Sequence, residues 1–170
     1  MTNWFTADYH FSHLNIIKYS QRPFKDLSHM KEVIIKNHNS RVKPEDFVYF
    51  LGDWGTPKEN FRETLARMNG HFIFIQGNHD YNNDIKTILH SGIIKIGGQL
   101  VYLVHRPDDY EPSFPINLVG HVHNLWKIKE LKDGTILFNV GIDQNNFYPI
   151  KWIEIEKEIT EWKKTNKEKK

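Results

Sequence analysis

Residues 72–80 read FIFIQGNHD and join a short apolar run to a polar cluster. The apolar part, residues 72–75, has the length and composition of a buried strand. The polar part, residues 77–80, brings Asn and His side chains directly behind a glycine, which permits a close backbone approach to a ligand. In α/β proteins, ligand sites lie at the carboxyl ends of the strands. The segment therefore predicts an α/β fold with a binding site at that edge of a sheet.

The same arrangement recurs along the chain, because other apolar runs also end in a polar cluster. Asp8-Tyr9-His10 follows residues 4–7, Gly52-Asp53 follows residues 47–51, His105 follows residues 100–104, and Gly120-His121-Val122-His123 follows residues 116–119. We expect these side chains to gather at one edge of the strands. In both Asp-x-His and His-x-His, the i, i+2 spacing points the two side chains to one face if the backbone is extended.

The remaining patterns predict further helices and strands. Helices are expected over residues 28–39 and near residues 84–90. A third helix is expected to open at Thr56 as N-cap, with Glu59 as its capping-box partner and Gly70 just past its end. Later strands are expected at residues 135–140 and 152–155, with Asp133-Gly134 as a turn. The order predicts an α/β fold with a β-rich second half and mixed sheets.

Composition bounds the class of protein. The chain has 170 residues, a net charge of +2 and no cysteine, which fits one compact domain and excludes thiolate chemistry and disulfides. We expect a single domain over residues 1–160 and a flexible lysine-rich tail over residues 161–170. The sequence shows neither a secretory signal nor an apolar run long enough to span a membrane, so we expect a cytoplasmic protein.

The polar clusters contain the ligand types of a transition-metal site. Carboxylates, imidazoles and one amide oxygen, without sulfur, suit manganese, iron, zinc or nickel better than an all-oxygen calcium site. Each motif alone is a weak signal, since Gly-Asp occurs in many turns. Their occurrence together, in this order and all after predicted strands, is hard to obtain from turns and core histidines.

These motifs resemble the calcineurin-like metallophosphoesterase superfamily. Its pattern runs Asp-x-His, Gly-Asp, Gly-Asn-His-Asp/Glu, His and Gly-His-x-His, and every part is present between Asp8 and His123. The opening segment at residues 8–17, Arg22-Pro23-Phe24 and residues 139–143 resemble a compact bacterial and phage branch. The resemblance implies a sandwich of two mixed sheets flanked by helices.

The resemblance also implies two adjacent metal ions, and residue roles follow position by position. Asp8, His10 and His123 would bind the first ion, Asp53 would bridge, and Asn78, His105 and His121 would bind the second. His79 would face the substrate as general acid, and Asp80 is a candidate to orient it. Manganese is the metal we expect first.

Three further residues are candidates for substrate contact, each with an ordinary structural alternative. His13 could reach the site or cap a helix. Arg22 could bind a phosphate oxygen or form a structural ion pair. Arg106, beside His105, could bind substrate or lie free on the surface.

The sequence predicts a dinuclear phosphoesterase in which a metal-bridged hydroxide attacks a phosphate mono- or diester. Diesters are slightly favoured because the chain leaves little room for a cap, and the partner would be a phosphate ester such as a nucleotide. A non-catalytic scaffold on the same fold is one alternative. A nuclease acting on short nucleic acids is another, although the low net charge argues against it.

Overall fold

The computed structural model describes residues 1–81, 85 and 89–167. The strands are β1 (Asn3–Thr6), β2 (Phe47–Phe50), β3 (His71–Phe74), β4 (Ser91–Ile96), β5 (Gln99–Val104), β6 (Ile116–Val119), β7 (Ile128–Glu130), β8 (Ile136–Asn139) and β9 (Ile150–Lys151). The helices are α1 (Leu14–Tyr19), α2 (Leu27–Arg41), α3 (Phe61–Ala66) and α4 (Trp152–Lys167), with 3-10 turns η1 (Pro107–Asp109) and η2 (Ile142–Gln144).

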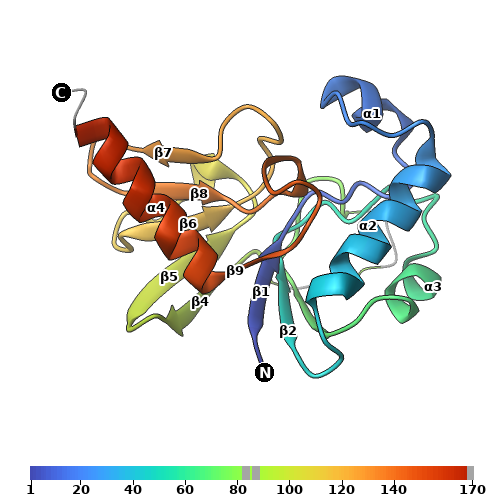
Figure 1. Cartoon of the computed structure of the whole chain (residues 1–170), viewed down its shortest axis with the longest axis horizontal. Coiled ribbons are helices and arrows are strands. Elements are labelled where there is room, and N and C mark those ends of the chain that lie inside the picture. Colours follow the sequence, from blue (N-terminus) through green and yellow to red (C-terminus); the bar gives the residue numbers. More distant parts are fainter. Residues whose placement is uncertain (82–84, 86–88, 168–170) are drawn as a thin grey trace.

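The strands form two mixed sheets, which confirms the predicted fold class (Figure 1). A four-stranded sheet has the order β3-β2-β1-β9, and a five-stranded sheet has the order β4-β5-β6-β8-β7. In the first sheet β1, β2 and β3 are parallel and β9 is antiparallel. In the second, β5, β6 and β8 are parallel, whereas β4 and β7 run antiparallel at its edges.

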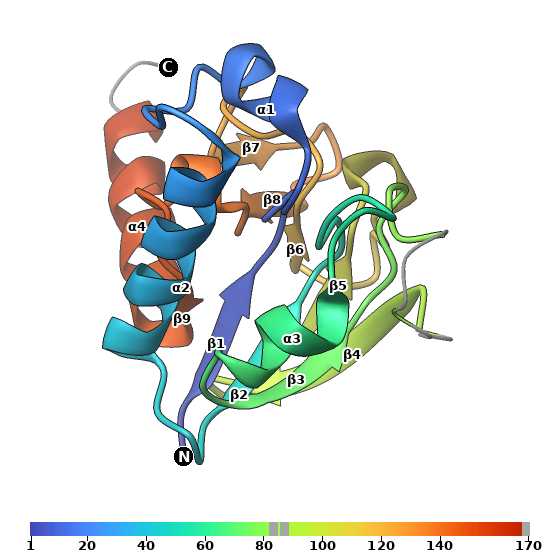
Figure 2. The same cartoon turned by 90° about the vertical axis from the view of Figure 1, so that its right-hand side faces the viewer.

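Alternation along β2 explains how the layers pack. Val48 and Phe50 belong to the apolar clusters under the helices, whereas Tyr49 packs against the cluster that joins the two sheets. Successive side chains of a strand point to opposite faces, so β2 is apolar on both. Figure 2 shows α2 and α3 outside the first sheet, while α4 lies on the side of the second sheet. The carboxyl ends of β1, β2, β3, β5 and β6 are left for the site.

The predicted last strand at residues 152–155 is wrong, because these residues begin α4. Trp152, Ile155 and Ile159 are all buried in the core between the sheets. Their i, i+3, i+7 spacing is that of a helix face, and the period shows only when the segment is read beyond residue 155. Helix α4 also continues to Lys167, so residues 161–167 of the predicted tail are helical.

The helix predicted to open at Thr56 begins later, at Phe61, with Asn60 as its N-cap. Glu59 does not complete a capping box. Its carboxylate instead accepts hydrogen bonds from Lys31 Nζ at 2.7 Å and from the hydroxyls of Ser12 and Thr64. These contacts take Glu59 into the interior beneath α2, where a charged group needs partners.

Sequence reading also missed β4, which pairs with β5 in a hairpin. Gly97 and Gly98 form its two-residue turn, with φ of 58° and 80°. A two-residue hairpin turn with positive φ at both central residues favours glycine at both positions, so Gly-Gly indicates such a hairpin. Strand β7 was missed as well, although the Asp133-Gly134 turn that joins it to β8 was expected. The helix predicted near residues 84–90 lies largely outside the described residues.

His38 of α2 ties a helix to the loop after β1. Its Nδ1 accepts a hydrogen bond from the Tyr9 hydroxyl at 2.9 Å, and its Nε2–H donates to the Asn69 carbonyl at 2.8 Å. Burial lowers the pKa of His38 from 6.5 to about 4. The folded protein therefore holds this ring neutral at a pH where the unfolded chain would protonate it.

We predict that His38 makes the metal-free protein less stable in acid. Because its pKa is lower in the folded state, its contribution is complete above pH ~6.5 and is lost as the pH falls toward ~4, amounting to about 3 kcal/mol. Urea unfolding of wild type and His38→Gln, in chelator at several pH values, measures this contribution. The free energy of unfolding should fall less steeply in the variant between these pH values. Parallel curves for the two proteins would contradict the assignment.

Candidate metal centre

The loops that follow β1 and β2 run side by side. The N–H of Asp8 donates to the Gly52 carbonyl at 3.0 Å, and the N–H of His10 donates to the Asp53 carbonyl at 3.0 Å. These bonds continue the parallel pairing of β1 and β2 beyond the strands and bring the two motifs together.

The backbone at five of the seven expected ligands is left-handed, not extended as the i, i+2 argument assumed. The φ angles are 62° at Asp8, 53° at His10, 62° at Asp53, 70° at His121 and 46° at His123. This region costs a non-glycine residue roughly 1–2 kcal/mol, and such outliers gather at functional sites. These five side chains therefore converge because the chain turns at each of them.

Glycine is required where two of these loops touch. A Cβ on Gly77 would lie 2.2 Å from Oδ1 of Asp53, and a Cβ on Gly52 would lie 2.6 Å from Nδ1 of His105. Gly52 also has a φ of 89°, which glycine adopts without strain. A larger residue at either position would push an expected ligand out of the cluster.

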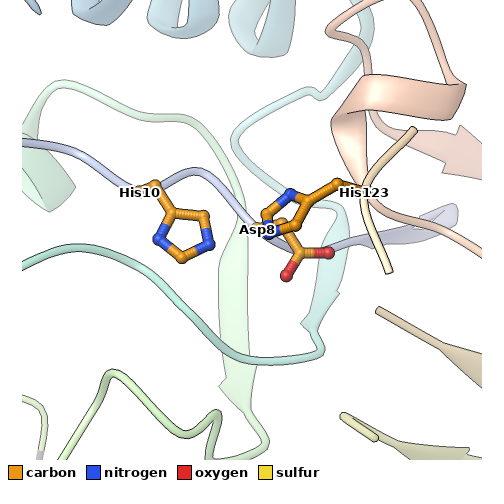
Figure 3. Close-up of side chains that lie close together, drawn as sticks. All are labelled: Asp8, His10 and His123. Atoms are coloured by element: carbon orange, nitrogen blue, oxygen red, sulfur yellow. The ribbon is translucent and has the colours of Figure 1, made fainter. Parts of the chain in front are cut away.

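The first group of ligands comes from two loops (Figure 3). Asp8 and His10 project from the loop after β1, and His123 projects from the loop after β6. Their ligand atoms lie within 4.8 Å of one another. The His121 N–H donates to both oxygens of Asp8, at 3.1 and 3.0 Å, which holds this carboxylate in place.

Asp53, the ligand expected to bridge, lies between two imidazoles. Its Oδ2 is 3.5 Å from Nε2 of His10 and 3.3 Å from Nε2 of His105. His105 Nδ1–H donates to the Leu51 carbonyl at 2.7 Å, so Nε2 faces Asp53. The same Nε2 is 3.1 Å from Oδ1 of Asn78. Asp53, His105 and His121 form a second group within 4.8 Å.

Burial and neighbouring charges shift the pKa values of Asp8, His105 and Asp53 in different directions. Burial raises the pKa of Asp8 to about 6 despite the nearby His105 and His123. Burial alone would lower the pKa of His105, but the hydrogen bond and charge of Asp53, with the charge of Asp8, raise it to about 9. Burial would raise the pKa of the Asp53 carboxyl, but the hydrogen bond and charge of His105 lower it. A metal at His105 Nε2 would have to displace a proton there.

His10 provides the clearest test of whether a metal fits. The residue is 1% exposed, yet neither Nδ1 nor Nε2 has a hydrogen-bond partner among residues 1–81, 85 and 89–167. Buried polar atoms are normally satisfied, and leaving one without a partner costs about 1–3 kcal/mol. With carboxylate and imidazole atoms grouped around it, the donor set fits a divalent transition metal.

His79 and His13 lie on the open side of the cluster. The exposed His79 donates its backbone N–H to Asp53 Oδ1 at 2.8 Å, and its ring centroid is 5.0 Å from that of His10. The centroids of His13 and His79 are 5.6 Å apart. The His13 Nδ1 accepts from the Ile16 N–H and caps α1, so its neutral ring carries the remaining proton on Nε2. His79 is also close enough to His10 and Asp53 to be a ligand itself.

Asp80 and Arg22 are both buried and make several contacts inside the protein. Asp80 accepts backbone hydrogen bonds from Asp53 and Gly77, both at 2.8 Å, and from Trp54 at 3.0 Å, which fastens the loops after β2 and β3 together. Arg22 is 4% exposed, and its guanidinium is engaged inside the protein by the structural ion pair described next. It has no donor left for substrate, so the ion-pair alternative holds.

Asp143 is the functional residue that sequence reasoning missed. Its carboxylate receives Arg22 Nε at 2.8 Å and Nη2 at 2.9 Å, and it accepts His123 Nδ1–H at 2.9 Å. Arg22 also donates to the carbonyls of Asp8 at 2.7 Å and Tyr9 at 2.9 Å. One buried ion pair thus positions two expected ligands. The only signal was that Asp143 ends the family-like segment at residues 139–143.

Arg106 remains exposed beside the second group of ligands. It lines a cavity of ≈ 200 Å³ together with Asn78, Tyr81 and His105, and its charge helps to lower the pKa of His121 after burial and His105. Because Arg106 lies near expected metal ligands, its contact with substrate stays a prediction.

Comparisons with known proteins identify the family. The family model for calcineurin-like phosphoesterases matches residues 1–170. An uncharacterized protein of Methanocaldococcus jannaschii, MJ1445, is 34% identical over 154 residues, which is 85% of this chain and 83% of that protein. The chain therefore belongs to the calcineurin-like phosphoesterase family, as the motifs predicted.

Solved structures agree on the fold. A protein of unknown function from Aquifex aeolicus, AQ665, superposes with a TM-score of 0.70 at 26% identity, covering 92% of this chain and 98% of that one. Vps29 of Chaetomium thermophilum has a TM-score of 0.51 at 8% identity, over 82% and 71% of the two chains, and shows the fold alone. Within the described part of the chain, no helix has both the length and the apolar character needed to cross a membrane.

We predict that Asp143→Asn weakens manganese binding about 10–100-fold, because removing the charge loosens His123 and Arg22 together. Isothermal titration calorimetry measures the affinity, and circular dichroism checks that the variant is folded. Asp133→Asn, at a carboxylate that is exposed on the surface, is the matched control and should bind as wild type. Wild-type affinity in folded Asp143→Asn would show that the contact with His123 does not matter for the metal.

Proposed function

We propose that this protein is a phosphoesterase that uses two divalent transition-metal ions to hydrolyse phosphate esters, with some preference for diesters. The observation that supports it most directly is His10, a buried imidazole with two unsatisfied nitrogens among the carboxylates of Asp8 and Asp53. Such an arrangement is costly unless the ring binds something. Manganese is our first choice because the carboxylate and amide oxygens suit it, while the imidazoles also suit iron, zinc or nickel.

The residues divide between two ions that share one ligand. We assign Asp8, His10 and His123 to one ion, Asn78, His105 and His121 to the other, and Asp53 to both. When bound, two such ions lower the pKa of water to supply a nucleophile and offset charge on the phosphate oxygens.

The chain's own groups handle the leaving group. As the bond between phosphorus and the ester oxygen breaks, the departing oxygen needs a proton, and we assign that proton to the exposed ring of His79. His13 lies beside it with an N–H available for the same oxygen or for a phosphate oxygen.

Metal stoichiometry and hydrolysis test the proposal together. Manganese-loaded protein should contain two ions per chain by elemental analysis and should cleave members of a panel: p-nitrophenyl phosphate, its bis ester, cyclic nucleotides, dinucleotides and short oligonucleotides. Chelation should abolish the activity. Asp53→Asn should lose both ions, whereas His10→Ala should lose mainly one.

Other outcomes would change the assignment. A maximum of one ion per chain would contradict the dinuclear centre. Two bound ions without hydrolysis of any ester would favour a non-catalytic scaffold, and cleavage restricted to oligonucleotides would favour a nuclease.

We predict that His79→Ala keeps both ions but loses activity according to the leaving group. The loss should be 10²–10⁴-fold for a ribose hydroxyl, which needs a proton, and much smaller for p-nitrophenolate, which does not. His121→Ala is the contrasting variant, because a lost ligand should weaken metal binding and slow both reactions alike. Equal losses in His79→Ala for both leaving groups at saturating metal would remove it from the acid role.

A further inference from the structure

A cavity of ≈ 390 Å³ opens directly beside the histidines of the metal centre. His10, His79, His121 and His123 form its polar side. This volume is in the range of small-molecule sites, which are mostly apolar with a few polar groups that fix orientation. The cavity is thus continuous with the place where a phosphate would lie.

The apolar residues that line this cavity come from two segments. Helix α1 contributes Ile16 and Tyr19, and the loop after β6 contributes Val122 and Leu125. Tyr19 is 73% exposed and Leu125 is 76% exposed. Large apolar side chains that are this exposed around a cavity commonly mark a binding surface.

A hydrogen bond joins the two segments that contribute these apolar residues. The Asn124 side chain donates to the Ser20 carbonyl at 3.3 Å and so joins the end of α1 to the loop after β6. His13 caps the start of α1, and the Leu125 N–H closes a turn onto the Val122 carbonyl at 3.0 Å. Each segment is therefore ordered by a contact of its own, and one hydrogen bond joins the two.

The other flank of the metal centre has a different character. There the cavity of ≈ 200 Å³ is lined by Asn78, Arg106 and Asp109 and suits charged or polar groups. His79 and His13, which we assigned to the leaving oxygen, line only the apolar cavity. Because one cavity is polar and the other is largely apolar, the two groups of a bound ester would occupy different cavities.

We propose that the cavity between α1 and the loop after β6, lined by Tyr19 and Leu125, binds the leaving-group alcohol, and that this alcohol carries a flat, largely apolar group such as an aryl ring or a nucleobase. The inference rests on the proposed function and adds the substrate class. Tyr19 and Leu125 are then specificity residues.

A binding experiment tests the cavity without requiring catalysis. Metal-loaded protein is titrated with phenylphosphonate and methylphosphonate, which share the anionic head and differ in the apolar group. Phenylphosphonate should bind about tenfold more tightly to wild type. Tyr19→Ala and Leu125→Ala should reduce this preference toward one, whereas Ile153→Ala, at another exposed apolar residue on α4, should keep it.

The result separates this inference from the proposed function. Equal affinity for the two phosphonates in wild type, or no measurable binding of phenylphosphonate, would overturn the inference even if esters are hydrolysed. A preference that needs Tyr19 and Leu125 would support the cavity as the site of the flat apolar group, and the kinetic comparison below then decides whether that group is the leaving alcohol. Both residues are exposed, so either variant should fold.

A kinetic comparison tests the direction of binding. In both methyl p-nitrophenyl phosphate and phenyl p-nitrophenyl phosphate the aryl leaving group is the same, and only the retained group differs. Tyr19→Ala should raise KM severalfold for both esters with little change in kcat. An effect confined to the phenyl ester would place the retained group in the cavity and overturn the assignment.

Discussion

The carboxylates of Asp8, Asp53 and Asp143 lie almost out of contact with water, and a charge in that position must be compensated by partners. Arg22 compensates Asp143, and His105 compensates Asp53. Asp8 accepts the His121 N–H on both oxygens and lies near the charges of His105 and His123, yet burial raises its pKa to about 6. The cluster is therefore stabilised only in part by the protein, which leaves a reason for it to bind cations.

This requirement shapes the surrounding chain. Left-handed backbone at Asp8, Asp53 and His121 turns the loops so that their side chains meet, and glycine at position 77 leaves room for the Asp53 carboxylate. Each left-handed residue opposes folding by roughly 1–2 kcal/mol. The packed sheets below and the Arg22–Asp143 pair beside them hold this strained arrangement. The stability of the scaffold and the geometry of the site are thus linked at the ends of the same strands.

Much of the site could be read from sequence because metal chemistry restricts the choice of residue. Few side chains other than Asp, His and Asn provide the required oxygen and nitrogen atoms, so Asp8, Asp53 and His123 stood out in short motifs. Roles that depend on distant partners could not be read in this way. The resemblance makes Asp80 a candidate to orient His79, whereas its hydrogen bonds from the backbone N–H groups of Asp53 and Trp54 are visible only in the tertiary structure. Arg22 and Asp143 are separated by 121 positions, and no local pattern announces their pair.

The sequence by itself identified the family and, through that resemblance, the two mixed sheets and the candidate ligands, because the motifs that carry the resemblance are short and local. The strand predicted from Trp152 was wrong because the segment was read over too few residues. Its helical spacing becomes visible only when the pattern is followed to Ile159. Only the tertiary structure decided that Arg22 is buried and unavailable to substrate, that Asp143 positions His123, and that Tyr19 and Leu125 face one cavity. These relations join segments far apart in the chain, and their geometry is set by how the sheets and loops pack.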